Sequence, residues 1–195
     1  IPELLEEVQW LIVNAHVPFI LCGSSARKLK RSGANLLGGR ALRYALFPLV
    51  YPEIPGFDLN RALNNGLLPR HYQADKPQGL MEAYVGDYLK EEIAAEALTR
   101  NIPAFSRFLE SAAFSNGELV NYQNIAAECG VSAPTVKQYF QILEDTLIAR
   151  LLPSFKKRPK RRVVQAPRFY FFDLGLANFL LRRGAIAPRS EAFGK

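Results

Sequence analysis

The segment 118–172 constrains the fold more than any other part of this chain, because its elements can be assigned one after another. A short helix is predicted over Tyr122–Glu128, a turn containing glycine over 129–132, and a longer helix over Pro134–Thr146 with Ser132 as its N-cap. The apolar face of the longer helix consists of Val136, Phe140, Leu143 and Leu147. Two helices joined by a short turn of this kind are typical of a helix-turn-helix.

The residues after the longer helix predict a hairpin. An apolar strand is expected over Leu147–Leu152 and a strand rich in β-forming residues over Arg168–Phe172. Between them the sequence has a basic tip from Lys156 to Arg162. A helix-turn-helix followed by such a hairpin is a winged helix, which we therefore predict over residues 117–173.

The net charge of +7 is unevenly distributed along the chain. Residues 8–52 contain six bases and no acid, residues 53–145 contain thirteen acids and seven bases, and residues 146–172 contain eight bases and no acid. Each basic zone is a candidate contact for phosphate, either of a nucleotide or of a nucleic-acid backbone. The simpler interpretation is that these bases only keep the surface soluble.

The winged helix offers a candidate DNA contact. The outward residues of its longer helix are expected to be Thr135, Lys137, Gln138 and Gln141. The phosphate contacts are expected from the tip, namely Lys156, Lys157, Arg158, Lys160, Arg161 and Arg162. Because Glu144 and Asp145 lie near the end of the same helix, packing against another domain or a protein is the alternative. Any DNA contact should come mainly from the tip and depend little on base sequence.

The rest of the chain predicts further elements and few reactive sites. They are an amphipathic helix over 3–14, a buried parallel strand at Pro18–Cys22, a basic helix at Ala26–Arg31, a strand at Arg40–Phe47, helices over 79–100 and 103–114 with Asn101 as a cap, and a short helix after Asp173. Asp173 is expected to cap that helix, with metal binding in a nuclease site as the alternative.

Several classes of protein are excluded by composition. The two cysteines, Cys22 and Cys129, lie far apart without neighbours at metal-ligand spacing, so we expect neither a disulfide framework nor a zinc site. No apolar run approaches the ~18 residues of a membrane span. We therefore expect a cytoplasmic protein with no membrane contact. His16 and His71 have no carboxylate at a useful spacing and are assigned no catalytic role.

Five short segments carry a family resemblance. They read LCGSSARKL at 21–29, LGGR at 37–40, FPL at 47–49, YVGDYL at 84–89 and YFFDLGL at 170–176. Together with the winged helix, and in this order, they resemble a large prokaryotic family of AAA-superfamily P-loop ATPases in which an uncharacterised domain follows the ATPase core. The resemblance implies an α/β remnant of a P-loop ATPase core joined to a mainly α domain with a winged helix-turn-helix.

The resemblance also implies a division of the chain. The expected parts are 1–55 from the C-terminal side of the ATPase core, 56–78 as a proline-rich connection, 79–116 as a helical region, 117–173 as the winged helix and 174–195 as the start of a truncated C-terminal segment. The family's phosphate-binding loop and its acidic magnesium motif are not in this sequence. The chain is therefore expected to be a piece of an ATPase that requires ATP and Mg²⁺ when intact, with no cofactor in the piece itself.

The same resemblance suggests catalytic residues. Ser24 falls at the sensor position that would contact the γ-phosphate or the attacking water, and its alternative role is to cap the helix at Ala26. Arg27 and Arg40 fall at two recurrent arginines of the family, and their alternative role is to pair with glutamates at the surface.

Three functions follow from these observations. The first is a nucleotide-driven switch that is an enzyme only when intact. The second is a nucleic-acid-binding module that holds duplex DNA through its basic tip. The third is a scaffold that binds another protein or a second copy of itself.

Overall fold

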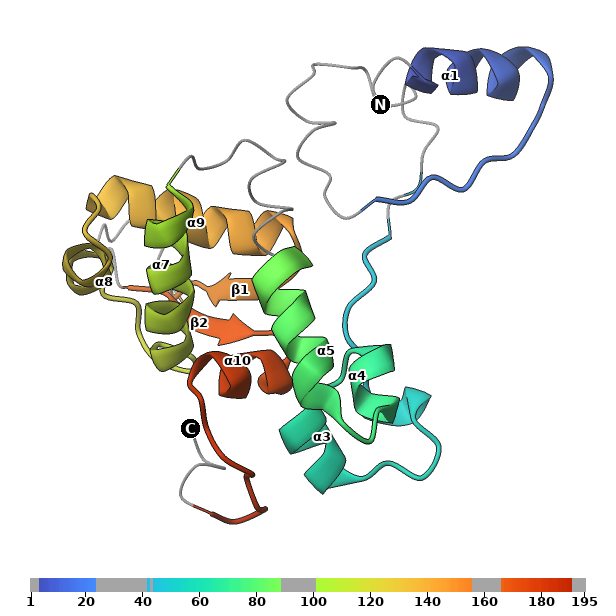
Figure 1. The fold of residues 1–195 in the computed structure, drawn as a ribbon. Coiled ribbons are helices and arrows are strands. Elements are labelled where there is room, and N and C mark those ends of the chain that lie inside the picture. Colours follow the sequence, from blue (N-terminus) through green and yellow to red (C-terminus); the bar gives the residue numbers. More distant parts are fainter. Residues whose placement is uncertain (1–3, 24–41, 43, 89–100, 156–165, 191–195) are drawn as a thin grey trace. The chain divides into compact units, whose positions relative to one another are not determined.

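The computed structural model describes residues 4–23, 42, 44–88, 101–155 and 166–190, and the chain divides into two units, Ile1–Leu46 and Phe47–Lys195. The described residues are mostly helical, with one small antiparallel sheet (Figure 1). The elements are α1 (Leu4–Asn14), α3 (Leu59–Asn65), α4 (Pro69–Gln73), α5 (Pro77–Ala83), α7 (Ile102–Phe114), α8 (Tyr122–Cys129), α9 (Ala133–Asp145), α10 (Leu174–Leu180), β1 (Ala149–Leu152) and β2 (Arg168–Phe171). A 3-10 turn at Tyr51–Glu53 and a π-helical turn at Tyr84–Tyr88 complete them. Within the described residues, no helix has the length and apolar character needed to cross a membrane.

The first unit confirms the predicted helix but not the predicted strand. Helix α1 covers almost the whole expected range, with Glu6 and Glu7 in its first turn. The strand predicted at Pro18–Cys22 is wrong, because these residues form no strand and Ile20 is 98% exposed. A buried parallel strand needs hydrogen-bonded neighbours on both sides, and the described residues of this unit provide none.

The second predicted strand of the first unit is not formed either. Of the range Arg40–Phe47, the residues that the structure describes have no strand conformation and are exposed. The predicted helix at Ala26–Arg31 lies outside the described residues. The described part of this unit therefore consists of one helix and chain without regular secondary structure.

Three capped helices form the centre of the second unit. The side chains of Asn101, Asn121 and Ser132 accept hydrogen bonds from free N–H groups in the first turns of α7, α8 and α9. Gly130 ends α8 in the left-handed conformation, with φ of 67°. The predicted caps of α7 and α9 are confirmed, and the three helices agree with the predicted ranges within a few residues.

Aromatic rings join these helices to the sheet. Phe108 of α7, Phe140 of α9 and Phe169 of β2 are fully buried. The ring centroids of Phe108 and Phe140 are 4.9 Å apart, and those of Phe140 and Phe169 are also 4.9 Å apart, both with edge-to-face geometry. Each such pair adds about 0.5–1.5 kcal/mol beyond the burial of apolar area. The inner face of β2 is therefore held firmly on α9.

The two strands pair antiparallel, and β2 is bonded along both edges. Ala149 lies opposite Phe171, and Leu152 lies opposite Arg168. On its other edge, Phe169 accepts a hydrogen bond from the N–H of Gly117 at 2.7 Å and donates one to the carbonyl of Glu118 at 3.1 Å. Residues 116–120 thus bond to the outer edge of β2 through isolated bridges and form no regular strand.

Leu147 corrects one detail of the prediction. It was expected on the inner face of the longer helix and at the start of a strand, but it lies between α9 and β1 with φ of 57°. The N–H groups of Leu147 and Ile148 donate to the carbonyls of Glu144 and Leu143, so the helix has already ended. The apolar periodicity continued one turn further than the helix itself.

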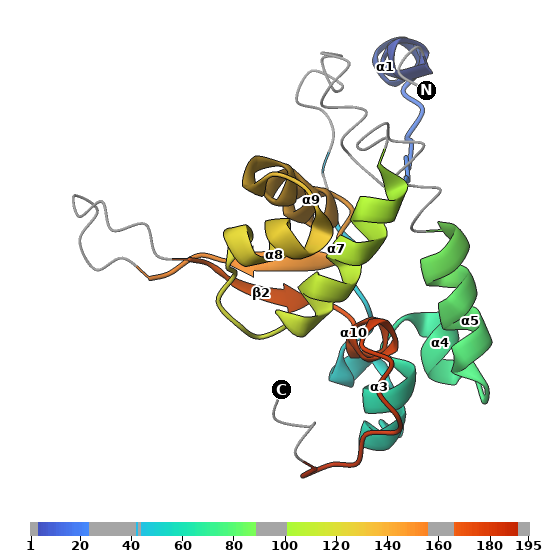
Figure 2. The ribbon, with the colours of Figure 1, turned by 60° about the vertical axis from the view of Figure 1, so that its left-hand side comes forward.

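Asp173 joins α10 to a distant part of the chain. One carboxylate oxygen accepts a hydrogen bond from the N–H of Leu176 at 2.8 Å, which confirms the predicted cap of α10. The other oxygen accepts hydrogen bonds from the N–H groups of Leu67 and Leu68 at 2.6 and 3.1 Å. Figure 2 shows α10 between α3 and the α7–hairpin layer, consistent with its contacts to α3, α5, α7 and β2.

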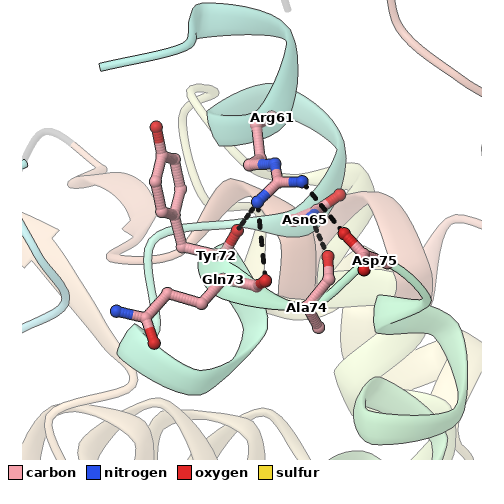
Figure 3. Close-up of polar contacts among 6 residues, drawn as sticks. All are labelled: Arg61, Asn65, Tyr72, Gln73, Ala74 and Asp75. Carbon is pink, nitrogen blue, oxygen red and sulfur yellow. Dashed lines mark hydrogen bonds and ion pairs between the residues drawn. The ribbon is translucent and has the colours of Figure 1, made fainter. Parts of the chain in front are cut away.

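The range 56–78, which the sequence suggested as a connection, contains two packed helices. Arg61 of α3 reaches the last carbonyls of α4, those of Tyr72 and Gln73, at 3.5 Å each, and Asn65 donates to the carbonyl of Ala74 at 2.9 Å (Figure 3). The ion pair between Arg61 and the highly exposed Asp75 contributes little. Helix α3 in turn contacts α10.

Replacing Gly66 should destabilise the second unit strongly. Gly66 has φ of 82°, and a Cβ there would collide with the carboxylate of Asp173. We expect Gly66→Ala to lower the free energy of unfolding by at least about 2 kcal/mol, measured by urea denaturation. Gly79→Ala is the matched control, since its Cβ meets nothing in α5, and it should raise stability by up to about 1 kcal/mol. Equal effects of the two substitutions would contradict the close approach at Gly66.

The two cysteines should differ sharply in reactivity. Cys129 is fully buried, and burial raises the pKa of its thiol, whereas Cys22 is exposed. We expect a chromogenic disulfide reagent to modify one thiol per native chain quickly and the second only in denaturant. In Cys22→Ser the fast phase should disappear. A fast phase that persists in this variant would contradict the burial of α8.

Candidate nucleic-acid interface

Helix α9 presents a short polar surface. Lys137, Gln138 and Gln141 are exposed, and Thr135 is half-buried with its hydroxyl 2.8 Å from that of Ser132. The ammonium of Lys137 lies 5.2 Å from the centroid of the Tyr122 ring. The surface therefore offers one cation and two amides to a ligand.

The two acids at the end of α9 make hydrogen bonds within the fold. A carboxylate oxygen of Glu144 accepts from the N–H of Leu151 in β1 at 3.0 Å, and Asp145 accepts from the amide of Gln141 at 3.2 Å. Burial, and secondarily the charge of Glu144, raises the pKa of the Tyr122 hydroxyl. Glu144 thus lies between the helices and the hairpin, where its hydrogen bond stabilises β1.

The outer side of the sheet is basic and aromatic. In both strands every second residue is exposed, and we call the four outward residues, Arg150, Leu152, Arg168 and Tyr170, the hairpin face. Arg150 lies opposite Tyr170, and Leu152 lies opposite Arg168, so the two arginines occupy diagonal corners. The hairpin face contains no acid. Its inward counterparts, including Phe169 and Phe171, belong to the core.

Arg168 is oriented by one hydrogen bond. Its guanidinium donates to the carbonyl of Gly117 at 3.1 Å. A guanidinium has five N–H donors, and within the part of the chain that the structure describes this bond leaves others for a ligand. The bond holds the arginine against the segment 116–120 without neutralising its charge.

A comparison with family models identifies the region that contains these features. The model described as "Domain of unknown function (DUF8612)" matches residues 56–186. The chain belongs to this family. The DUF8612 region includes α3 to α10, and with them both the Asp173 network and the hairpin face. Comparisons with curated proteins and with solved structures gave no match.

Many of the predicted site residues fall outside the described residues. These are Ser24, Arg27 and Arg40, and the six bases of the tip, Lys156, Lys157, Arg158, Lys160, Arg161 and Arg162. Of the predicted residues on α9, all four are described, and they lie on one helix of the DUF8612 region. In the described ranges, no group of three or more histidine, cysteine or acidic side chains could hold a metal ion.

The prediction missed the hairpin face as a unit. The sequence places Arg150 and Arg168 in a basic zone, and Tyr170 in the predicted strand and in the family segment 170–176, but it predicts no binding role for the three residues together. The alternation of Arg168, Phe169, Tyr170 and Phe171 was a usable signal, because a strand with one face in the core exposes every second residue.

The position of Glu144 can be tested through Tyr122. The folded state raises the pKa of Tyr122 above its unfolded value of about 10. The free energy of unfolding is therefore highest while the hydroxyl is protonated, and it falls as the pH rises above that unfolded value. We expect Glu144→Gln to lower the pKa of Tyr122, measured by ultraviolet titration against Tyr122→Phe. Asp145→Asn is the control and should leave this pKa unchanged. No response to Glu144→Gln would contradict the position of its carboxylate.

Proposed function

We propose that residues 101–172 form a winged helix-turn-helix that binds duplex DNA mainly through its hairpin. The order of elements supports this proposal: a helix (α7), a short bonded segment (116–120), two helices (α8 and α9) and a hairpin. The segment 116–120 pairs with β2, as the short first strand of a winged helix does.

The observation that carries the proposal is the charge of the hairpin. Its outer face has two arginines and no acid, and the chain between the two strands has six more bases in its sequence. A surface of this kind favours the phosphate backbone. Glu144 and Asp145 keep their negative charge although they bond within the fold, so phosphate contacts are expected at the hairpin and not at that end of α9.

The binding is expected to depend little on base sequence. Helix α9 exposes one lysine and two glutamines, and of these only the glutamines offer the paired donor and acceptor that can recognise adenine. Most contacts would therefore be to phosphate, and affinity would fall steeply with salt.

Duplex binding by the purified chain tests the proposal. We expect affinity for unrelated duplexes to be similar, and replacement of the six tip bases by alanine to abolish binding at 150 mM salt. Replacing Arg150 and Arg168 by alanine should weaken binding and reduce the slope of log Kd against log salt by about two. The matched control is Arg70→Ala with Lys76→Ala, which removes two exposed charges from α4 and the turn after it. Unchanged affinity in both hairpin variants would overturn the proposal.

A second candidate function is the nucleotide-driven switch. The observation that favours it is the exposure of α1. This helix has no buried residue, and the exposed fractions of Trp10 and Val13 are 59% and 45%. Apolar surface of this kind marks a contact with another structure, and the family resemblance suggests the rest of a nucleotide-binding core. The full gene product tests this candidate. ATP hydrolysis that is lost in Ser24→Ala would support it, and a full gene product without a phosphate-binding loop would overturn it.

A further inference from the structure

We infer that the hairpin face is a base-stacking surface, so that the module prefers DNA with an unpaired base beside a duplex over an uninterrupted duplex. This inference rests on the proposed function and adds the form of DNA that is bound. It concerns the side of the sheet that faces away from α9 and the core.

The position of Tyr170 is the first reason. Tyr170 is 40% exposed, although the neighbouring Phe169 and Phe171 are almost completely buried. Arg150 lies directly opposite Tyr170. Arg168 lies two residues away on the same face, at about 7 Å by strand geometry. The ring therefore has a cation across the strand pair and another along its own strand.

The apolar content of the face is the second reason. Leu152 is 52% exposed and lies opposite Arg168. Phosphate alone would contact the two arginines and would leave the apolar surface of Leu152 and Tyr170 without a partner. A ligand that brings both a flat apolar surface and negative charge complements all four residues, and a nucleotide with an accessible base is such a ligand.

Phe155 adds a second ring to the same hairpin. It follows β1 by three residues, is 91% exposed, and directly precedes the six bases in the sequence. Phe155 lies beyond the paired residues of β1 and β2, so its exposure is an observation separate from the strand register that positions Tyr170. Exposed aromatic residues interspersed with cations are the usual means of binding unpaired bases without sequence preference.

Whether a base is accessible determines which form of DNA the hairpin face can bind by stacking. In a duplex the bases are stacked on one another and present only their edges in the grooves. A ring on a sheet surface can stack on a base only where that base is unpaired. The phosphate contacts proposed above need no such opening, so the same hairpin can hold a duplex weakly and an overhang more tightly.

Fluorescence anisotropy with three labelled DNAs tests the inference: a blunt duplex, the same duplex with a single-stranded overhang, and the overhang strand alone. We expect the overhang duplex to bind most tightly to the unmodified chain. Tyr170→Leu keeps apolar volume without the ring and should weaken overhang binding by roughly 5- to 150-fold, with blunt-duplex affinity within twofold of the original. Tyr170→Phe should behave as the original chain does.

A control and the contrary outcomes complete the experiment. Phe114→Ala removes an exposed ring at the end of α7 and should not affect binding to any of the three DNAs. If blunt and overhang duplexes bind equally and Tyr170→Leu changes neither, the inference is overturned and the proposed function remains. If none of the DNAs binds, both are overturned, and an acidic peptide that binds instead would assign the hairpin face to a protein.

Discussion

The buried carboxylate of Asp173 is the interaction on which the arrangement of the second unit depends. It is 3% exposed, and it accepts three backbone hydrogen bonds, one from α10 and two from the turn before α4. A buried carboxylate without such partners would be costly, so α10 and the α3–α4 turn must meet for the fold to form. Gly66 and Gly175 permit this approach, because a Cβ at either position would overlap the opposite segment. Two asparagines of α3 and α10, Asn64 and Asn178, add side-chain hydrogen bonds to distant backbone.

The same contact determines how the hairpin is presented. Asp173 follows β2 by two residues, so the end of that strand is anchored as soon as α10 is in place. The middle of β2 is anchored by Phe169, whose ring packs on Phe140. With both points held, the outward direction of Arg168 and Tyr170 follows from the alternation of a strand. A binding surface on rigid elements loses less conformational entropy when a ligand binds than one on a free loop.

The elements that could be predicted from sequence are those with local causes. The helices α7 and α9 have their caps, Asn101 and Ser132, within three residues of the groups that they satisfy. Asp173 is predictable as a cap for the same reason. Its bonds to Leu67 and Leu68, however, join residues more than a hundred positions apart, and no local sequence pattern predicts such bonds. The strand at Pro18–Cys22 failed on the same principle, because a strand requires a partner that its own residues do not specify.

The distribution of charge shows why the hairpin, and not α9, is the better candidate for binding. Helix α9 buries five of its residues, Val136, Tyr139, Phe140, Ile142 and Leu143, and so serves first as the support on which the hairpin packs. Its two carboxylates accept hydrogen bonds from the N–H of Leu151 and the amide of Gln141 and keep their negative charge, which disfavours phosphate at this end of the helix. The hairpin differs in its exposed charge: its buried apolar side chains face α9, and its two arginines face outward. The apolar contacts that hold the fold together and the cations that attract an anion therefore lie on opposite sides of one sheet.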